Sequence, residues 1–238
     1  MPFAPALRSE WLKIRTLRSL LGSLSAVLLA TAAFSALAAT DSGGADFDPL
    51  YSTFFGVNFG QIAAIAFGTT AMSAEFRGGA LRLSLAAVPD RTRWFAAKAA
   101  AVAAPALAVG LLTGLVGLAV GRAVLGSDGP GWGEGLRAAV GCAVYLTLMA
   151  LLAAGLTAVL RSGVATLSIL IPFLLIVSFV VGDLSGGVAD LLPDRAGQIA
   201  LHRTWDGTLG PWTGLAVTAL WTSAALAAGA WSVRRRDA

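Results

Sequence analysis

Six stretches of this sequence run for 21 to 27 residues without an Asp, Glu, Lys or Arg. A helix needs about 20 mostly apolar residues to cross the hydrocarbon core of a bilayer, so each stretch is long enough to span a membrane. They cover residues 19–40, 49–74, 99–121, 138–160, 162–182 and 207–233. The pattern predicts an all-α polytopic membrane protein with six transmembrane helices.

The composition agrees with a membrane protein. Hydrophobic residues make up 57% of the 238 residues and charged residues only 13%, which leaves a soluble domain too little polar surface to cover itself. Six spans use most of the length, so we expect a single transmembrane domain over residues 1–238. The predicted spans are approximately 20–40, 53–74, 99–121, 138–160, 163–182 and 211–232, with one long loop, 75–98.

Basic residues are distributed unequally between the two sets of loops. Thirteen of the 17 Lys and Arg residues lie at the two termini, in the loop between the second and third spans, or in the loop between the fourth and fifth spans. The other four lie in loops on the opposite side. Because an excess of Lys and Arg marks the cytoplasmic side, we expect both termini in the cytoplasm and a multi-pass protein of the cell inner or plasma membrane. The basic residues suit anionic membrane lipid, and nucleic acid is not implied as a partner.

The first span has an alternative interpretation. A basic stretch, an apolar run and the small-residue pattern of residues 36–38 also resemble a secretory signal with its cleavage site. The apolar run is longer than a usual signal core and follows a long lead-in, which favours retention as a transmembrane helix.

The sequence offers little for catalysis. Cys142 and His202 are single residues of their kinds, and there is no G-x-S-x-G motif and no phosphate-binding G-x-x-x-x-G-K-[ST] loop. We therefore expect no enzyme activity, no metal and no cofactor, and any ATP hydrolysis would occur on a partner. None of the six runs contains an Asp, Glu or His, the residues that ion-driven transporters use to relay protons or bind ions within their spans. Asn58 and Gln61 share one helical face, where they could make interhelical hydrogen bonds or line a translocation path.

The loop 75–98 carries the most local information. Gly78 and Gly79 predict the end of the second span. Apolar residues then recur at helical spacing, at Leu81, Leu85 and Val88, and predict a short amphipathic helix that Pro89 ends. Asp90 follows in a position to cap the helix that leads into the third span.

The segment before the first span predicts a second amphipathic helix. Leu7, Trp11 and Ile14 share one face and polar residues lie opposite, which is typical of a helix in the membrane interface.

These motifs resemble the ABC-2 type transporter permeases. The resemblance rests on Glu-Phe-Arg-x-Gly at 75–79, Leu-Arg-x-x-Leu-x-x-x-Pro at 81–89, the lead-in at 9–15 and the Leu-Leu-Pro at 191–193, in six-span order over the whole chain. Ala80 departs from the family, because many members carry Thr there.

The resemblance implies an exporter of a hydrophobic or amphipathic compound. A separate ABC ATPase subunit would energise it, and a second copy of the chain would complete a homodimer. It also implies that the loop couples to the ATPase through Glu75, Arg77, Gly79, Leu81, Arg82, Leu85, Val88, Pro89, Arg91 and Lys98. The alternative is a non-transporting membrane anchor or immunity-type membrane protein.

The distribution of basic residues leads to a topology prediction. Reporter fusions after Asp46 and after Asp206 should read outside, and fusions at Asp90 and at the C-terminus should read inside. A C-terminal reporter that reads outside contradicts six spans. A mature chain that starts near Ala39 would show that the first span is a cleaved signal.

Overall fold

The computed structural model describes residues 3–39, 48–126, 129–177, 180, 186–204 and 209–235, and within these ranges every regular element is helical. The α-helices are α1 (Phe3–Thr16), α2 (Arg18–Ala39), α3 (Pro49–Phe54), α4 (Val57–Ser73), α5 (Ala80–Ala87), α6 (Arg91–Leu125), α7 (Trp132–Leu160), α8 (Gly163–Pro172), α10 (Pro193–Gln198) and α11 (Pro211–Arg235). Shorter 3₁₀ and π turns are η1 (Ala74–Phe76), η3 (Phe173–Val177), η4 (Gly186–Leu191) and η5 (Ile199–Leu201).

Five helices among the described residues are long and apolar enough to cross a membrane. They are Arg18–Ala39, Pro49–Phe76, Arg91–Leu125, Trp132–Leu160 and Pro211–Arg235. The second of these combines α3, α4 and η1. The prediction of an all-helical membrane protein is therefore confirmed, with five candidate spans where the sequence predicted six.

The predicted fifth span, 163–182, differs from the other five. Its α-helix α8 has 10 residues and ends at Pro172, after which the chain continues as the short π-helix η3. Proline has no N–H to donate within a helix and its ring crowds the preceding turn, so a change of helical geometry is expected at this point. Residues 178–179 and 181–185 lie outside the described part of the chain, and a membrane span over 163–182 stays a prediction.

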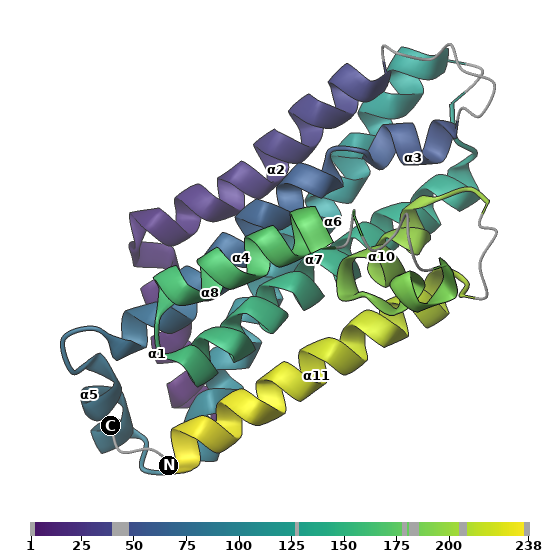
Figure 1. Ribbon diagram of the computed structural model, residues 1–238. Helices are drawn as coiled ribbons and strands as arrows, with labels where there is room; N and C mark the ends of the chain where they lie inside the picture. The colour runs from purple at the N-terminus through teal and green to yellow at the C-terminus, as the bar shows by residue number, and fades with distance from the viewer. Residues whose placement is uncertain are drawn as a thin grey trace.

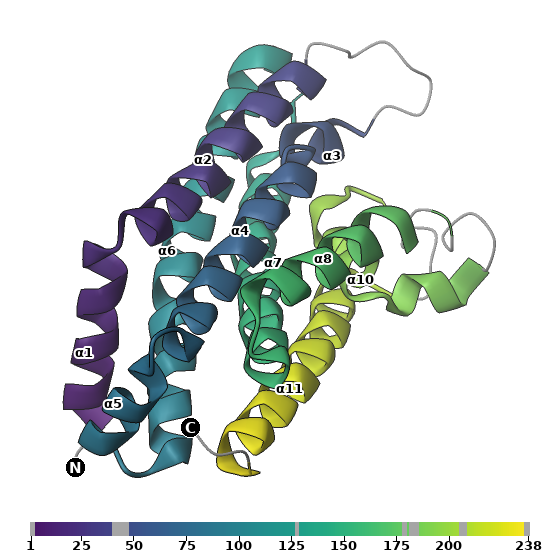
Figure 2. The ribbon, with the colours of Figure 1, turned by 60° about the vertical axis from the view of Figure 1, so that its left-hand side comes forward.

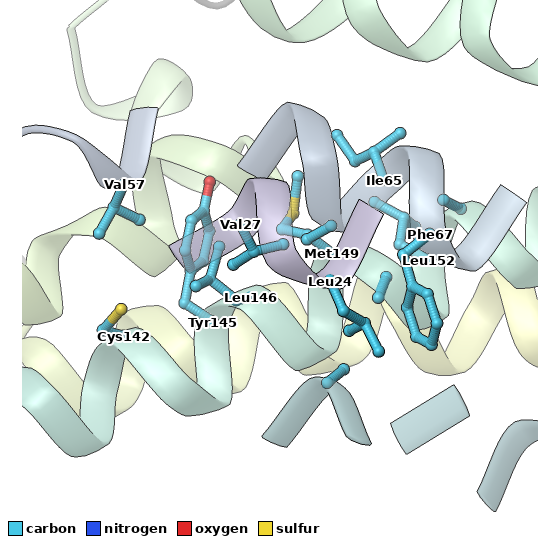
Figure 3. Packing of buried hydrophobic residues seen from close by; sticks show 14 of the residues in the cluster. Leu24, Val27, Val57, Ile65, Phe67, Cys142, Tyr145, Leu146, Met149 and Leu152 are labelled. Carbon is cyan, nitrogen blue, oxygen red and sulfur yellow. The ribbon is translucent and has the colours of Figure 1, made fainter. Parts of the chain in front are cut away.

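The long helix α7 is central to the bundle and packs against α4, α6 and α11, while α2 lies against α4 and α6 (Figure 1). Large apolar side chains from α2, α4 and α7 fill the space between these helices (Figure 3). Tyr145, Met149 and Leu146 of α7 are almost fully buried there. Cys142 is buried in the same cluster, where it packs as a small apolar residue.

Small residues let the helix backbones approach closely. A Cβ atom at Gly68 of α4 would lie 1.9 Å from the carbonyl oxygen of Ala150 in α7. A Cβ at Gly155, on another face of α7, would lie 2.7 Å from the carbonyl carbon of Ala225 in α11. Because apolar association is weak in lipid, such close van der Waals contact is a main source of helix–helix affinity.

Both described ends of the chain lie at the same end of the bundle, together with α5 (Figures 1 and 2). The Arg91 guanidinium at the start of α6 donates to the carbonyl oxygen of Val233 near the end of α11, at 2.8 Å. The elements α3 and α10 lie toward the opposite end (Figure 2), and η5 contacts both of them.

The contact at Gly68 leads to a stability prediction. Gly68→Ala should lower the free energy of unfolding by about 1–3 kcal/mol, because α4 and α7 must separate to admit the methyl group. Thermal unfolding in detergent, followed by tryptophan fluorescence, measures the loss. Gly22→Ala is the matched control, since a Cβ there meets no atom within 4 Å, and it should not lower the midpoint. An equal decrease in both variants would contradict this account of the packing.

Candidate functional site

The loop 75–98 folds as the sequence predicts. The second span ends in η1, Gly78 and Gly79 adopt positive φ values of 59° and 77°, and α5 follows immediately. The Asp90 carboxylate accepts hydrogen bonds from the backbone N–H groups of Thr92 and Arg93 and so caps α6. Left-handed backbone is accessible to glycine at little cost, which explains two glycines at this sharp turn.

The apolar stripe of α5 faces the protein's own chain. Leu81 is buried in a small apolar cluster with Met72 and Trp94, and Leu85 and Val88 pack against the same cluster. Leu85 and Val88 are only partly buried there, and contact of the stripe with an ATPase stays a prediction. The outward face consists of Arg82, Leu83, Ala86 and Ala87, and Leu83 is 74% exposed.

Four charged side chains meet beneath α5, and we call Glu10, Lys13, Glu75 and Lys98 the ion cluster. Lys98 Nζ lies 2.8 Å from Glu10 Oε2 and 2.7 Å from Glu75 Oε1. Lys13 Nζ lies 2.8 Å from Glu10 Oε1 and 2.9 Å from Glu75 Oε1. Each ammonium group thus contacts both carboxylates, and the formal charges of the cluster cancel.

Three of the four side chains in the ion cluster are almost completely removed from solvent. The side chains of Glu10, Glu75 and Lys98 are 2–3% exposed, whereas Lys13 is 37% exposed. Burial disfavours the charged form of Lys13, but its hydrogen bonds and attraction to Glu10 and Glu75 outweigh this and raise its pKa. Charges with this little exposure need close partners, because desolvation costs several kcal/mol for each ion.

The ion cluster joins elements that are distant in the sequence. Glu10 and Lys13 belong to α1, Glu75 to η1 and Lys98 to α6. Ser84 of α5 adds a fourth element, since its hydroxyl donates to Glu75 Oε2 at 3.0 Å and accepts from Lys13 Nζ at 3.3 Å. The lead-in helix, the loop helix and the start of the third span are therefore fixed to one another.

A cavity of about 360 Å³ opens beside the ion cluster. Its lining residues come from η1, α5 and the end of α7, and they are Glu75, Phe76, Gly79, Leu81, Arg82 and Arg161. The Arg161 guanidinium lies 5.7 Å from the centre of the Phe76 ring. Arg161 itself ends α7 in the left-handed conformation, with φ of 54°.

The remaining predicted loop residues lie around this unit. Arg77 and Pro89 are exposed, and Gly79 lines the cavity. Arg91 binds the end of α11 through the Val233 carbonyl oxygen. Glu75 and Lys98 are buried in the ion cluster, and their predicted role in coupling stays a prediction.

The lead-in helix α1 also differs in which side it buries. Its buried residues are Ala6, Glu10 and Ile14, and Leu7 is partly buried against the core, but Trp11 is 39% exposed. The predicted apolar face is therefore divided between the bundle and the outside. Glu10 pairs with Lys98, and this pairing determines which side of α1 faces the bundle. The outer side still combines Trp11 and other exposed apolar residues with exposed arginines, as suits a membrane interface.

Asn58 and Gln61 both make hydrogen bonds within the chain. The Tyr145 hydroxyl of α7 donates to the buried Gln61 Oε1, and Gln198 Nε2 donates to the Tyr145 oxygen at 3.3 Å. Asn58 Nδ2 donates to the Phe55 carbonyl oxygen at 2.9 Å. This arrangement matches the interhelical alternative for Gln61, and a role of either residue in a translocation path stays a prediction.

A second group of polar contacts lies at the opposite end of the bundle. His202 Nδ1 lies 3.4 Å from Asp48 Oδ2, and the His202 ring stacks on Tyr51 with centres 4.2 Å apart. Burial opposes ionisation of Asp48, but hydrogen bonds from His202 and from the backbone of Arg203 and Tyr51 outweigh it and lower its pKa. Within the described residues, no group of three or more His, Cys, Asp or Glu side chains could hold a metal ion.

Sequence reasoning missed Glu10, Lys13, Ser84 and Arg161 as members of the site. A signal was present, because Glu10 is the only acidic residue among the first 40 and Glu75 the only one between Asp48 and Asp90. Isolated acids in otherwise basic segments indicate an ion pair, although the sequence does not specify the partner. No family model and no curated protein matches this chain.

Unequal burial within the ion cluster predicts unequal mutational effects. Lys98→Met should destabilise the protein by about 3–5 kcal/mol, because two buried carboxylates lose their best-shielded cation. Lys13→Met should cost clearly less, since Lys13 is partly exposed and water can replace it. Thermal unfolding of both variants in the same detergent gives the comparison. Equal losses would show that burial does not govern the strength of these pairs.

Proposed function

We propose that this protein is the membrane-spanning subunit of an ABC transporter of the ABC-2 type. It would export a hydrophobic or amphipathic compound across the cell inner membrane, as a homodimer energised by a separate ATPase subunit. The observation that carries the proposal is that the two segments with the clearest resemblance, 9–15 and 75–98, meet through the ion cluster. A short helix held this firmly at the end of the bundle suits the transmission of force.

The contacts of α5 suggest how such a force would be transmitted. The exposed face with Arg82, Leu83, Ala86 and Ala87 is the surface available to a partner, and the buried face packs on Met72 and Trp94. Ser84 adds a polar connection to Glu75 and Lys13. Closure of a partner ATPase against α5 would therefore move α1 and the start of α6 together.

The course of the chain supports six passes and termini on one side. At the end of α7, Arg161 lies over Phe76, and the end of α11 binds Arg91, so both helices end beside the loop 75–98. The first turn of α11 packs against α10, because Gly214 lies against the Ala196 backbone, at the opposite end of the bundle. The segment that begins with α8 would therefore return the chain across the membrane.

A direct test changes the outward face of α5. Leu83→Asp should abolish co-purification of the ATPase and stimulation of its ATP hydrolysis, because a carboxylate would be buried without a partner in the contact. Insertion and thermal stability should stay unchanged, since Leu83 is exposed. The measurement uses tagged protein purified from its native membrane, followed by identification of co-eluting subunits and an ATPase assay.

Thr92→Asp serves as the matched control. It adds the same charge at an exposed position at the same end of the molecule, on α6 instead of α5, and it should leave the complex intact. If Leu83→Asp retains the ATPase as wild type does, α5 is not the contact. If no P-loop subunit co-elutes with wild type, the non-transporting anchor or immunity-type protein becomes the better account.

A further inference from the structure

We propose that Arg15 and Arg18, at the junction of α1 and α2, bind the phosphate of an anionic phospholipid from the leaflet on the side of α1. The inference goes beyond transport, because it uses only the chemistry of this junction and its place beside a candidate span. Arg15 is the penultimate residue of α1, and Arg18 begins α2. Guanidinium groups bind phosphate oxygens with paired, charge-assisted hydrogen bonds.

The positive charge of both arginines is available to a ligand. Both side chains are exposed, and within the part of the chain that the structure describes no hydrogen bond, ion pair or ring contact engages either guanidinium. The nearby carboxylate of Glu10 is already matched, because Lys13 and Lys98 pair with it. Glu10 is also the only acidic residue among the first 40. The two arginines therefore determine the sign of the potential at the junction, which favours an anion.

The backbone places the two arginines close together. The Leu17 N–H donates to the Lys13 carbonyl oxygen at 3.1 Å, and the Leu17 carbonyl oxygen accepts from the Leu21 N–H at 3.2 Å. Helical hydrogen bonds thus continue from α1 into α2, and residues three apart on helical backbone are neighbours at its surface. Arg15 and Arg18 are therefore in position to bind one phosphate together.

The junction lies where the chain enters the membrane. The helix α2 is a candidate span, and the charge-free run 19–40 starts directly after Arg18. Together, α1 and the start of α2 lie along one edge of the bundle (Figure 2). Basic residues immediately outside a span, on the side rich in Lys and Arg, are typical contacts of anionic headgroups.

Exposed apolar residues beside the two arginines favour a lipid over free phosphate or an acidic protein surface. Leu17, between the arginines, is 41% exposed, and Leu21, in the first turn of α2, is 45% exposed. Leu29 is 67% exposed about two turns farther along α2, so apolar surface continues into the membrane. A phospholipid places its phosphate on the arginines and an acyl chain along α2, which satisfies both features.

The experiment measures lipid binding to the purified full chain in neutral detergent, with native mass spectrometry as the readout. Short-chain phosphatidylglycerol and short-chain phosphatidylcholine are titrated separately, and inorganic phosphate is then added as a competitor. Phosphatidylglycerol should bind about tenfold more tightly than phosphatidylcholine, a ratio typical of one strong charged contact. Millimolar inorganic phosphate should not displace it, because free phosphate makes no apolar contact with α2.

Variants then identify the site. Arg15→Gln combined with Arg18→Gln should weaken phosphatidylglycerol binding by about tenfold, because both guanidinium contacts are lost. The control pair Arg8→Gln and Arg77→Gln removes the same charge from exposed positions at the same end of the molecule, away from the junction. It should change affinity by no more than about twofold, as expected for screened surface charge.

Four outcomes would overturn the proposal. They are equal affinity for the two lipids, displacement by inorganic phosphate, equal loss in the two pairs of variants, and full lipid binding by the junction pair. Full lipid binding together with loss of a co-purifying protein would show that the junction is a protein contact instead. Arg18→Gln alone keeps the test valid if the junction pair fails to insert, because Arg15 still flanks the span. It should weaken binding by about threefold, and unchanged binding by this variant would also count against the site.

Discussion

The arrangement of one whole end of this protein depends on the need to match buried charge. Two carboxylates and two ammonium groups meet with almost no exposure for three of the four, and each cation contacts both anions. Desolvated ions are tolerated only when every one has a close partner. Since the members come from α1, η1 and α6, these elements cannot separate without exposing an uncompensated charge to an apolar surrounding. Such a contact contributes geometry more than stability, because its desolvation cost offsets much of its attraction.

The bundle around α7 is held together by a different kind of contact. At Gly68 and Gly155 the backbone of α7 and of its neighbours approach to distances that leave no room for a methyl group. Movement of α7 would therefore be shared by α4 and α11. By contrast, α8 is short and ends at Pro172, and within the described part of the chain it packs mainly against α4, α7 and η3. The described residues thus combine a tightly packed centre with a short helix, α8, beside it.

Local signals in the sequence predicted local structure well. Gly78 and Gly79 mark the turn, Pro89 follows the end of α5, and Asp90 caps α6, because each residue acts on its own backbone. Periodicity gave the face of α5 but not its partner, since a stripe of Leu81 and Leu85 fits its own bundle as well as another protein. The lack of charged residues over 162–182 indicated an apolar segment but not the length of its α-helix. That helix ends at Pro172.

Pairs between distant residues could not be predicted in the same way. Glu10 and Lys98 are 88 residues apart, and nothing in either segment specifies the other. Glu10 also divided the predicted apolar face of α1, because its pairing turns the side with Glu10 and Ile14 toward the bundle and leaves Trp11 exposed. Similarly, Gln61 reaches Tyr145 only because α4 and α7 pack closely. Polar residues in apolar helices therefore indicated that contacts exist, while the tertiary structure determined which ones.

The neutrality of the ion cluster has a consequence for the energetics of movement in an energised membrane. A net charge displaced across the full membrane voltage does work of about 2.3 kcal/mol per elementary charge at 100 mV. The ion cluster contains two lysines and two glutamates, and each lysine lies within hydrogen-bonding distance of both glutamates. If these four groups moved together through part of that field, their contributions would cancel. Displacement of the cluster would therefore be electrically silent, so membrane voltage would neither drive nor oppose it.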